Sequence, residues 1–149
     1  MISDIKTKAL CDTMKDGRGI IDEAKEYVDT EPGKYFHVVM AAKFQPDFKG
    51  VLRMEIAHAK SGFRTYQIVT NPSKHMLTDP ENEGELCFGS PGIPVSILLG
   101  RNYRPVPGQR DTVTVKLFLD NKEISTKELL VRGTASYYIG RHGEFDRND

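Results

Sequence analysis

The residues best suited to binding chemistry fall in two segments of the C-terminal half of the chain. Residues 100–110, GRNYRPVPGQR, contain three arginines, one tyrosine and no acidic residue. Residues 137–147, YYIGRHGEFDR, add two tyrosines, two arginines and a histidine. Arginine and tyrosine are enriched among the residues that dominate interface energies, and proline lowers the entropy lost when a loop is fixed on a partner. The predicted binding residues are Arg101, Tyr103, Arg104, Arg110, Tyr138, Arg141 and His142.

We expect a non-enzymatic protein-interaction or assembly module, whose partner is another protein or a second copy of this chain. Loops 71–92 and 100–111 and the C-terminal tail are the expected contact surface. Two alternatives use the same side chains. Arg101 and Arg104, with a histidine, could hold a nucleotide or another phosphate-containing substrate of a small enzyme, and arginine with tyrosine could stack on single-stranded nucleic acid. The formal net charge of zero gives no general attraction to nucleic acid or to an anionic membrane.

No residue is assigned a catalytic role. The segment IAHAKSGFRTY, residues 56–66, gathers a histidine, two cations and a tyrosine, but no base or nucleophile is placed beside His58. FGSPG, residues 88–92, differs from the G-x-S-x-G nucleophile motif because Phe88 stands where that motif needs glycine. An enzyme would instead need a pocket in which His58 or His37 meets a carboxylate or an arginine.

The histidine and cysteine spacing predicts neither a metal site nor a cofactor. No HxH, HExxH or CxxC pattern presents two ligands from one element. The acidic loop at 79–85 lacks the DxDxDG layout of an EF-hand, although calcium binding between loops stays open. The four histidines are dispersed, at His37, His58, His75 and His142.

The composition is that of one globular domain with free thiols. A chain of 149 residues can bury a single core, and Cys11 and Cys87 form no CxxC pair. The chain lacks both a run of about 20 apolar residues and the apolar core of a signal peptide at its start. We therefore expect a cytoplasmic protein without a membrane segment.

Two short helices are predicted at the N-terminus. The first covers about residues 4–15, with Ser3 as its cap and Gly17 after its end. The second covers IIDEAKEYVD, residues 20–29, because its apolar residues recur at i, i+1, i+4, i+7 and i+8. This apolar stripe would pack on the sheet or supply a contact between copies of the chain.

From Lys34 onward the pattern changes to short strands separated by turns. Seven or eight such strands without intervening helices predict an antiparallel β-sandwich or open barrel. The expected fold is one predominantly β, α+β domain over 1–149, with a helical segment at 1–31, the β-sandwich at 34–140 and a tail at 141–149. The candidate strands are KYFHVVMAA, GVLRMEIAHA, FRTYQIVT, ELCF, PVSILL, DTVTVKLFLD, EISTKELLV and TASYYI.

The first predicted hairpin has a three-residue loop at 60–62, with Gly62 in the left-handed conformation. Ala59 then lies opposite Phe63, and His58 lies opposite Arg64 near the open end of the sheet, where side chains reach water. This register sorts apolar residues onto one face. The residues that would share it are Met54, Ile56, Tyr66 and Ile68.

The second predicted hairpin, residues 113–131, reverses through DNKE, residues 120–123, in which Asp120 and Asn121 are good turn residues. Pairing of Leu119 with Ile124 would bring Val113 opposite Leu130. The pattern is similar to that of hairpins in immunoglobulin-like modules.

Overall fold

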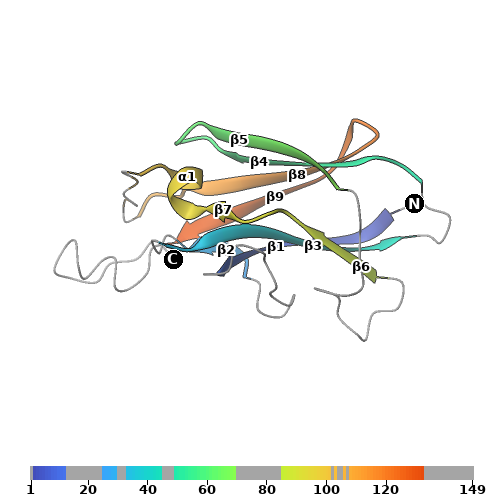
Figure 1. Cartoon of the computed structure of the whole chain (residues 1–149), viewed down its shortest axis with the longest axis horizontal. Coiled ribbons are helices and arrows are strands. Elements are labelled where there is room, and N and C mark those ends of the chain that lie inside the picture. The colour runs from blue at the N-terminus through green and yellow to red at the C-terminus, as the bar shows by residue number, and fades with distance from the viewer. Residues whose placement is uncertain are drawn as a thin grey trace.

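The computed structural model describes residues 2–12, 25–29, 33–44, 49–69, 85–101, 103, 106 and 108–132. This part of the chain forms two β-sheets and one short helix, so the predominantly β prediction is confirmed (Figure 1). The elements are β1 (Ile2–Asp12), β2 (Tyr27–Asp29), β3 (Tyr35–Phe44), β4 (Leu52–His58), β5 (Phe63–Val69), β6 (Glu85–Gly89), β7 (Ile93–Pro94), α1 (Val95–Leu99), β8 (Thr112–Leu119) and β9 (Lys122–Arg132).

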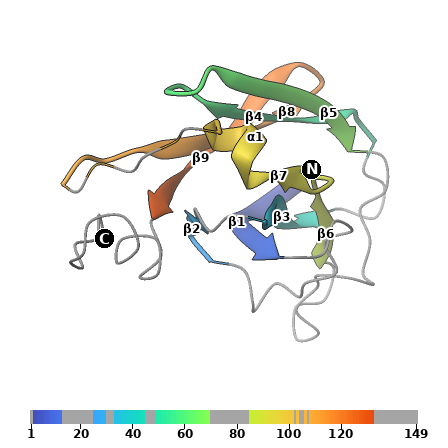
Figure 2. The same ribbon diagram turned by 60° about the vertical axis from the view of Figure 1, so that its left-hand side comes forward.

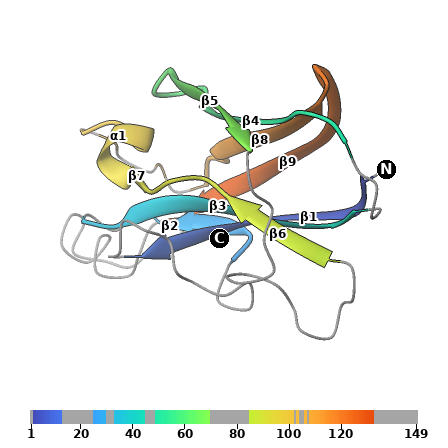
Figure 3. The same ribbon diagram turned by 45° about the vertical axis from the view of Figure 1, so that its right-hand side comes forward.

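The two sheets differ in size and share one core, an arrangement consistent with a β-sandwich. The first has the order β1-β3-β6, with β7 also paired to β3, and the second has the order β2-β9-β8-β4-β5. All described pairings are antiparallel except β2 with β9, which is parallel. Figure 3 shows the two sheets one above the other, with α1 at one end.

The first N-terminal helix was a wrong prediction. Residues 2–12 are strand β1, which pairs along its length with β3. Thr7 and Ala9 are buried while Lys6 is exposed and Lys8 half-buried, which is the period of a strand. Pairing with β3 outweighs the weak helical propensity of this segment.

The second N-terminal helix was also a wrong prediction in the part that the structure describes. Residues 13–24 lie outside the described part, but Tyr27–Asp29 form strand β2. Just before it, Lys25 and Ala9 exchange two backbone hydrogen bonds of 2.7 Å, so residues 25–29 pass from the first sheet to the second (Figure 2). Val28 has no exposed surface, so it belongs to the core.

The core lies between the inner faces of the two sheets. β3 contributes most, with Phe36–Ala42 all buried, because both of its faces are covered. The segment PVSILL, predicted as a strand, instead forms β7 and α1. Val95, Leu98 and Leu99 recur at helical spacing, and the helix turns all three toward the core. Among the described residues no helix has the length and apolar character needed to cross a membrane.

The β4–β5 hairpin is present, but its register differs by one residue from the prediction. The connecting loop, residues 59–62, has four residues, and His58 pairs with Phe63. Gly62 has the expected left-handed conformation, with φ of 79°. The shift turns Tyr66 and Ile68 to the outer face, while the residues on the inner face of β4 stay buried. Met54 and Ile68 therefore lie on opposite faces of the sheet.

The β8–β9 hairpin reverses within the predicted segment 120–123, but its turn consists of Asp120 and Asn121 alone, both with positive φ angles. Leu119 pairs with Lys122, however, rather than with Ile124. A bulge between Leu117 and Phe118 then shifts the rest of the ladder, which brings Val113 opposite Leu129. The predicted inner face is confirmed, since Val113, Val115 and Leu117 are buried.

Candidate binding pocket

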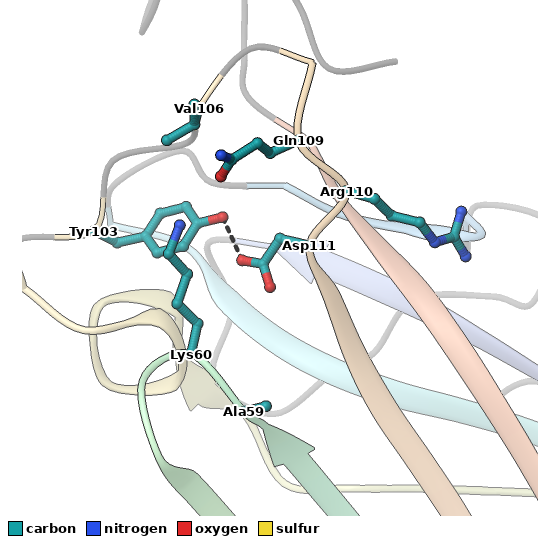
Figure 4. A pocket seen from close by; sticks show the side chains of 7 residues that line it. All are labelled: Ala59, Lys60, Tyr103, Val106, Gln109, Arg110 and Asp111. Carbon is teal, nitrogen blue, oxygen red and sulfur yellow. Dashed lines mark hydrogen bonds between the residues drawn. The ribbon is translucent and has the colours of Figure 1, made fainter.

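A pocket of about 420 Å³ opens at one end of the second sheet (Figure 4). It lies between the β4–β5 loop and the segment that leads into β8. These two segments meet because β4 and β8 are antiparallel neighbours, with Ala57 opposite Thr114. The C-terminal end of β4 and the N-terminal end of β8 therefore lie side by side at the same end of the sheet. The lining residues are Ala59, Lys60, Tyr103, Val106, Gln109, Arg110 and Asp111.

Two cations give the pocket its basic character. Lys60 is exposed, and its Nζ lies 5.6 Å from the centre of the Tyr103 ring. Arg110 has 68% of its side chain exposed and makes a 3.4 Å ion pair with Glu128, which is itself largely exposed. Such a surface pair contributes little energy, so the Arg110 guanidinium can turn to a ligand. Figure 4 shows Lys60 beside the tyrosine ring and the Arg110 side chain directed away from the other lining side chains.

A hydrogen-bonded chain supports the pocket from below. The Tyr103 hydroxyl donates to Asp111 Oδ2 at 2.6 Å, and the same oxygen lies 2.9 Å from His58 Nε2. On the other side of the imidazole, Nδ1 lies 2.8 Å from Ser61 Oγ, which donates to the Leu98 carbonyl at 2.8 Å. The chain thus connects the β4–β5 loop, the last turn of α1 and the segment before β8.

The carboxyl of Asp111 is held in its charged form. Burial alone would raise its pKa, but the hydrogen bonds from Tyr103 and His58 and the electrostatic influence of His58 and Lys60 outweigh burial and lower the pKa below the ordinary 3.8. The negative charge at the pocket floor is therefore engaged by two donors and attracted by Lys60, while Arg110 makes only the exposed ion pair with Glu128.

The predicted binding residues divide into three groups. Tyr103 and Arg110 line the pocket, and Arg101 is exposed nearby but is not part of the lining. The others lie outside the described residues: Arg104, Tyr138, Arg141 and His142. The acidic loop at 79–85 lies outside them as well, apart from Glu85.

Sequence reasoning missed Lys60, and it included Gln109 and Asp111 only as part of loop 100–111 without naming them as binding residues. Gln109 and Asp111 are neighbours of Arg110 in sequence, but Lys60 comes from a different hairpin. The position of Lys60 in the fold could have indicated its role, because the loop after one strand and the segment before its antiparallel neighbour meet at the same end of the sheet. Reading that signal requires the β4–β8 pairing, which the sequence pattern did not provide.

The two histidines that the structure describes, His37 and His58, are buried. His58 meets a carboxylate, as the enzyme alternative requires, but it has no exposed surface and is not among the pocket-lining residues. Its position near the sheet end was expected to reach water, and that expectation was wrong. His37 is buried in β3 with 2% of its surface exposed. In the part of the chain that the structure describes, no three His, Cys, Asp or Glu side chains converge as metal ligands would.

The chain matches no protein-family model, and the search of curated proteins finds no relative.

Proposed function

We propose that this protein is a binding module that takes an acidic group of a protein partner into the pocket formed by the β4–β5 loop and residues 103–111. The observation that carries the proposal is the placement of Lys60 and Arg110 around a cavity of about 420 Å³. That volume lies within the range of ordinary ligand sites, and it suits one or two side chains of a partner.

The arrangement of charge supports a carboxylate as the ligand. Asp111 already accepts hydrogen bonds from Tyr103 and His58, so its carboxylate needs no further donor from the ligand. Lys60 and Arg110 together can accept one anionic group, and the Tyr103 ring and Val106 add apolar contact. A rigid sheet end that carries such loops is a common place for recognition sites.

The scaffold for this module is proposed to be an immunoglobulin-like β-sandwich. Its cytoplasmic location stays a prediction, as does the part of the contact surface in loops 71–92 and the C-terminal tail.

A small enzyme is the second candidate, because Asp111, His58 and Ser61 form one hydrogen-bonded chain. Ser61 Oγ is a poor nucleophile in this geometry, since it donates to the Leu98 carbonyl and accepts the Phe63 N–H at 3.1 Å. The same pocket would then favour inorganic phosphate or a nucleotide over a carboxylate.

Binding can be tested with a short glutamate-rich peptide and, separately, with inorganic phosphate. We expect the peptide to perturb the amide resonances of 59–62 and 103–111, and the double substitution Lys60→Ala with Arg110→Ala to weaken binding by about tenfold, the loss of two modest ion pairs.

The matched control is Lys49→Ala with Lys122→Ala. These exposed lysines lie at the other end of the second sheet, where Leu52 pairs with Leu119, and their removal changes the net charge equally. Equal weakening by both double variants would show a nonspecific charge effect and reject the pocket. Binding of phosphate or a nucleotide but not of the peptide would favour the enzyme candidate instead.

A further inference from the structure

Within the described part of the chain, strand β5 is an edge strand with one unpaired side. It is the last strand of the second sheet, and among the described strands it pairs with β4 alone. Figures 1 and 3 show β5 as the outermost strand of that sheet. Alternate residues of an edge strand direct backbone N–H and C=O groups away from the sheet, where they can pair with another strand.

The described residues of β5 carry almost none of the features that protect an edge from pairing. Such edges usually contain proline, lysine, a bulge or an inward-pointing charge. β5 has the sequence FRTYQIV, with Arg64 as its one charged residue, and its ladder with β4 runs through seven pairs without a register shift. It also exposes 50% of Tyr66 and 61% of Ile68, two of the large apolar side chains most open to solvent in the described part.

We propose that β5 pairs with β5 of a second copy of this chain, antiparallel and about a two-fold axis at Tyr66. Tyr66 is the middle residue of β5, so this is the register that pairs all seven residues. The contact is isologous and closes as a dimer.

The side chains fit this register on both faces. On the outer face Tyr66 lies opposite Tyr66 of the second copy, and Arg64 lies opposite Ile68, so no like charges meet. On the inner face Phe63 lies opposite Val69, and Thr65 lies opposite Gln67. Apolar residues therefore meet apolar residues at both ends of the inner row, and the polar pair lies between them.

The tyrosine at the centre is already held in place. The Arg53 guanidinium lies 5.3 Å from the centre of the Tyr66 ring and 4.5 Å from that of Phe118, and the Arg64 guanidinium lies 5.6 Å from the Tyr66 ring. Arg64 is in turn bonded to Glu55 at 2.8 Å. A ring fixed by two cations loses less entropy when a second copy arrives.

The test is the oligomeric state of the full chain, measured by analytical ultracentrifugation over a range of concentrations. We expect a monomer–dimer equilibrium. Tyr66→Lys and Tyr66→Glu should each weaken the dimer by about tenfold or more, because each places two like charges opposite one another at the axis. An equimolar mixture of the two variants should restore the dimer, since opposite charges then meet.

The mixture makes the test specific to the register. Restoration requires position 66 of one copy to face position 66 of the other, and it shows that both variants are folded. The matched control is Ile97→Lys on α1, a side chain with 57% exposure, which should dimerise like the unsubstituted chain.

Three results would overturn the proposal: a monomer at every concentration, a mixture that stays monomeric, or equal dissociation by Ile97→Lys. The proposal stands apart from the pocket, because the Lys60→Ala and Arg110→Ala double variant should dimerise normally even if its peptide binding is lost.

Discussion

Replacing His58 with leucine tests whether the hydrogen-bonded chain below the pocket stabilises the fold. The substitution fills most of the ring volume but removes both nitrogens. Asp111 Oδ2 loses its hydrogen bond with His58 Nε2, 2.9 Å away, and Ser61 Oγ loses its hydrogen bond with His58 Nδ1, 2.8 Å away. A hydrogen bond to a charged group contributes about 1.5–3 kcal/mol and a neutral one about 0.5–1.5 kcal/mol, so we expect the free energy of unfolding to fall by about 3 kcal/mol.

The assay is urea unfolding followed by far-ultraviolet circular dichroism, with the melting temperature as a second measurement. A loss of about 3 kcal/mol is a large fraction of the roughly 5–15 kcal/mol that stabilises a typical domain. It corresponds to a fall in Tm of about 6–12 °C for a chain of this size. The comparison variant is Tyr103→Phe, which removes a single donor to Asp111 and should cost about 1–2 kcal/mol.

The two variants should also be coupled, because both donors serve Asp111 Oδ2. Groups that share one network have interaction energies of about 0.5–3 kcal/mol in a double-mutant cycle. A His58→Leu variant that is destabilised by less than about 0.5 kcal/mol, a surface-like effect, would refute a stabilising role for the chain. Strict additivity with Tyr103→Phe would show that the carboxylate does not couple the two residues.

Two further predictions concern acid stability and the β8–β9 turn. Hydrogen bonding and nearby charge lower the pKa of Asp111 in the native state below the ordinary 3.8, so the native state binds fewer protons than the unfolded chain. The resulting stabilisation is complete above the unfolded pKa and is lost as pH falls through the native pKa. Asp111→Asn should therefore flatten the acid limb of a plot of unfolding free energy against pH, and an unchanged limb would contradict the assignment. Asn121 lies in the two-residue turn with a φ of 69°, a conformation that glycine adopts easily and alanine does not. Asn121→Ala should therefore lower the free energy of unfolding, measured in urea, by about 1–2 kcal/mol, whereas Asn121→Gly should leave it nearly unchanged. Equal effects of the two substitutions would show that the turn relaxes.

The strands that the sequence predicted well are those with regular alternation. β4 and β8 place every second residue in the core, and this pattern is visible in GVLRMEIAHA and DTVTVKLFLD without any knowledge of neighbours. The turn at Asp120 was equally local, because both turn residues tolerate positive φ angles.

The errors arose where non-local pairing decides the outcome. Residues 2–12 form a strand because β3 supplies a partner, and no local signal shows that partner. The register was wrong in both hairpins. In the β4–β5 hairpin the loop has four residues instead of three, which shifts the ladder by one residue. In the β8–β9 hairpin the turn has two residues, so Leu119 pairs two residues before the predicted Ile124, and the bulge between Leu117 and Phe118 reduces the difference to one residue at Val113. Ile68 favoured the wrong register in the β4–β5 hairpin, because an apolar side chain is expected in the core, whereas Ile68 lies on the outer face.

The candidate pocket was predictable only in part, again because non-local pairing forms it. Tyr103 and Arg110 were identified by residue type in a proline-rich loop, which requires only local information. His58 and Asp111 are 53 positions apart and meet because β4 and β8 are neighbours, so their chain could not be derived without the sheet order. Lys60 joins the pocket through the same pairing.

The pocket and the edge strand are linked by the β4–β5 loop, which supplies Lys60 to one and leads directly into the other. In an antiparallel dimer centred on Tyr66, the two copies of this loop lie at opposite ends of the paired strands. Six residues separate Lys60 from Tyr66, so at about 3.4 Å per residue the two pockets lie roughly 40 Å apart. A partner with two acidic segments that can span this distance would bind both pockets at once, and its affinity would exceed that of either segment alone. If both proposals hold, dimerisation would strengthen binding at the pocket, and the edge of β5 would serve recognition.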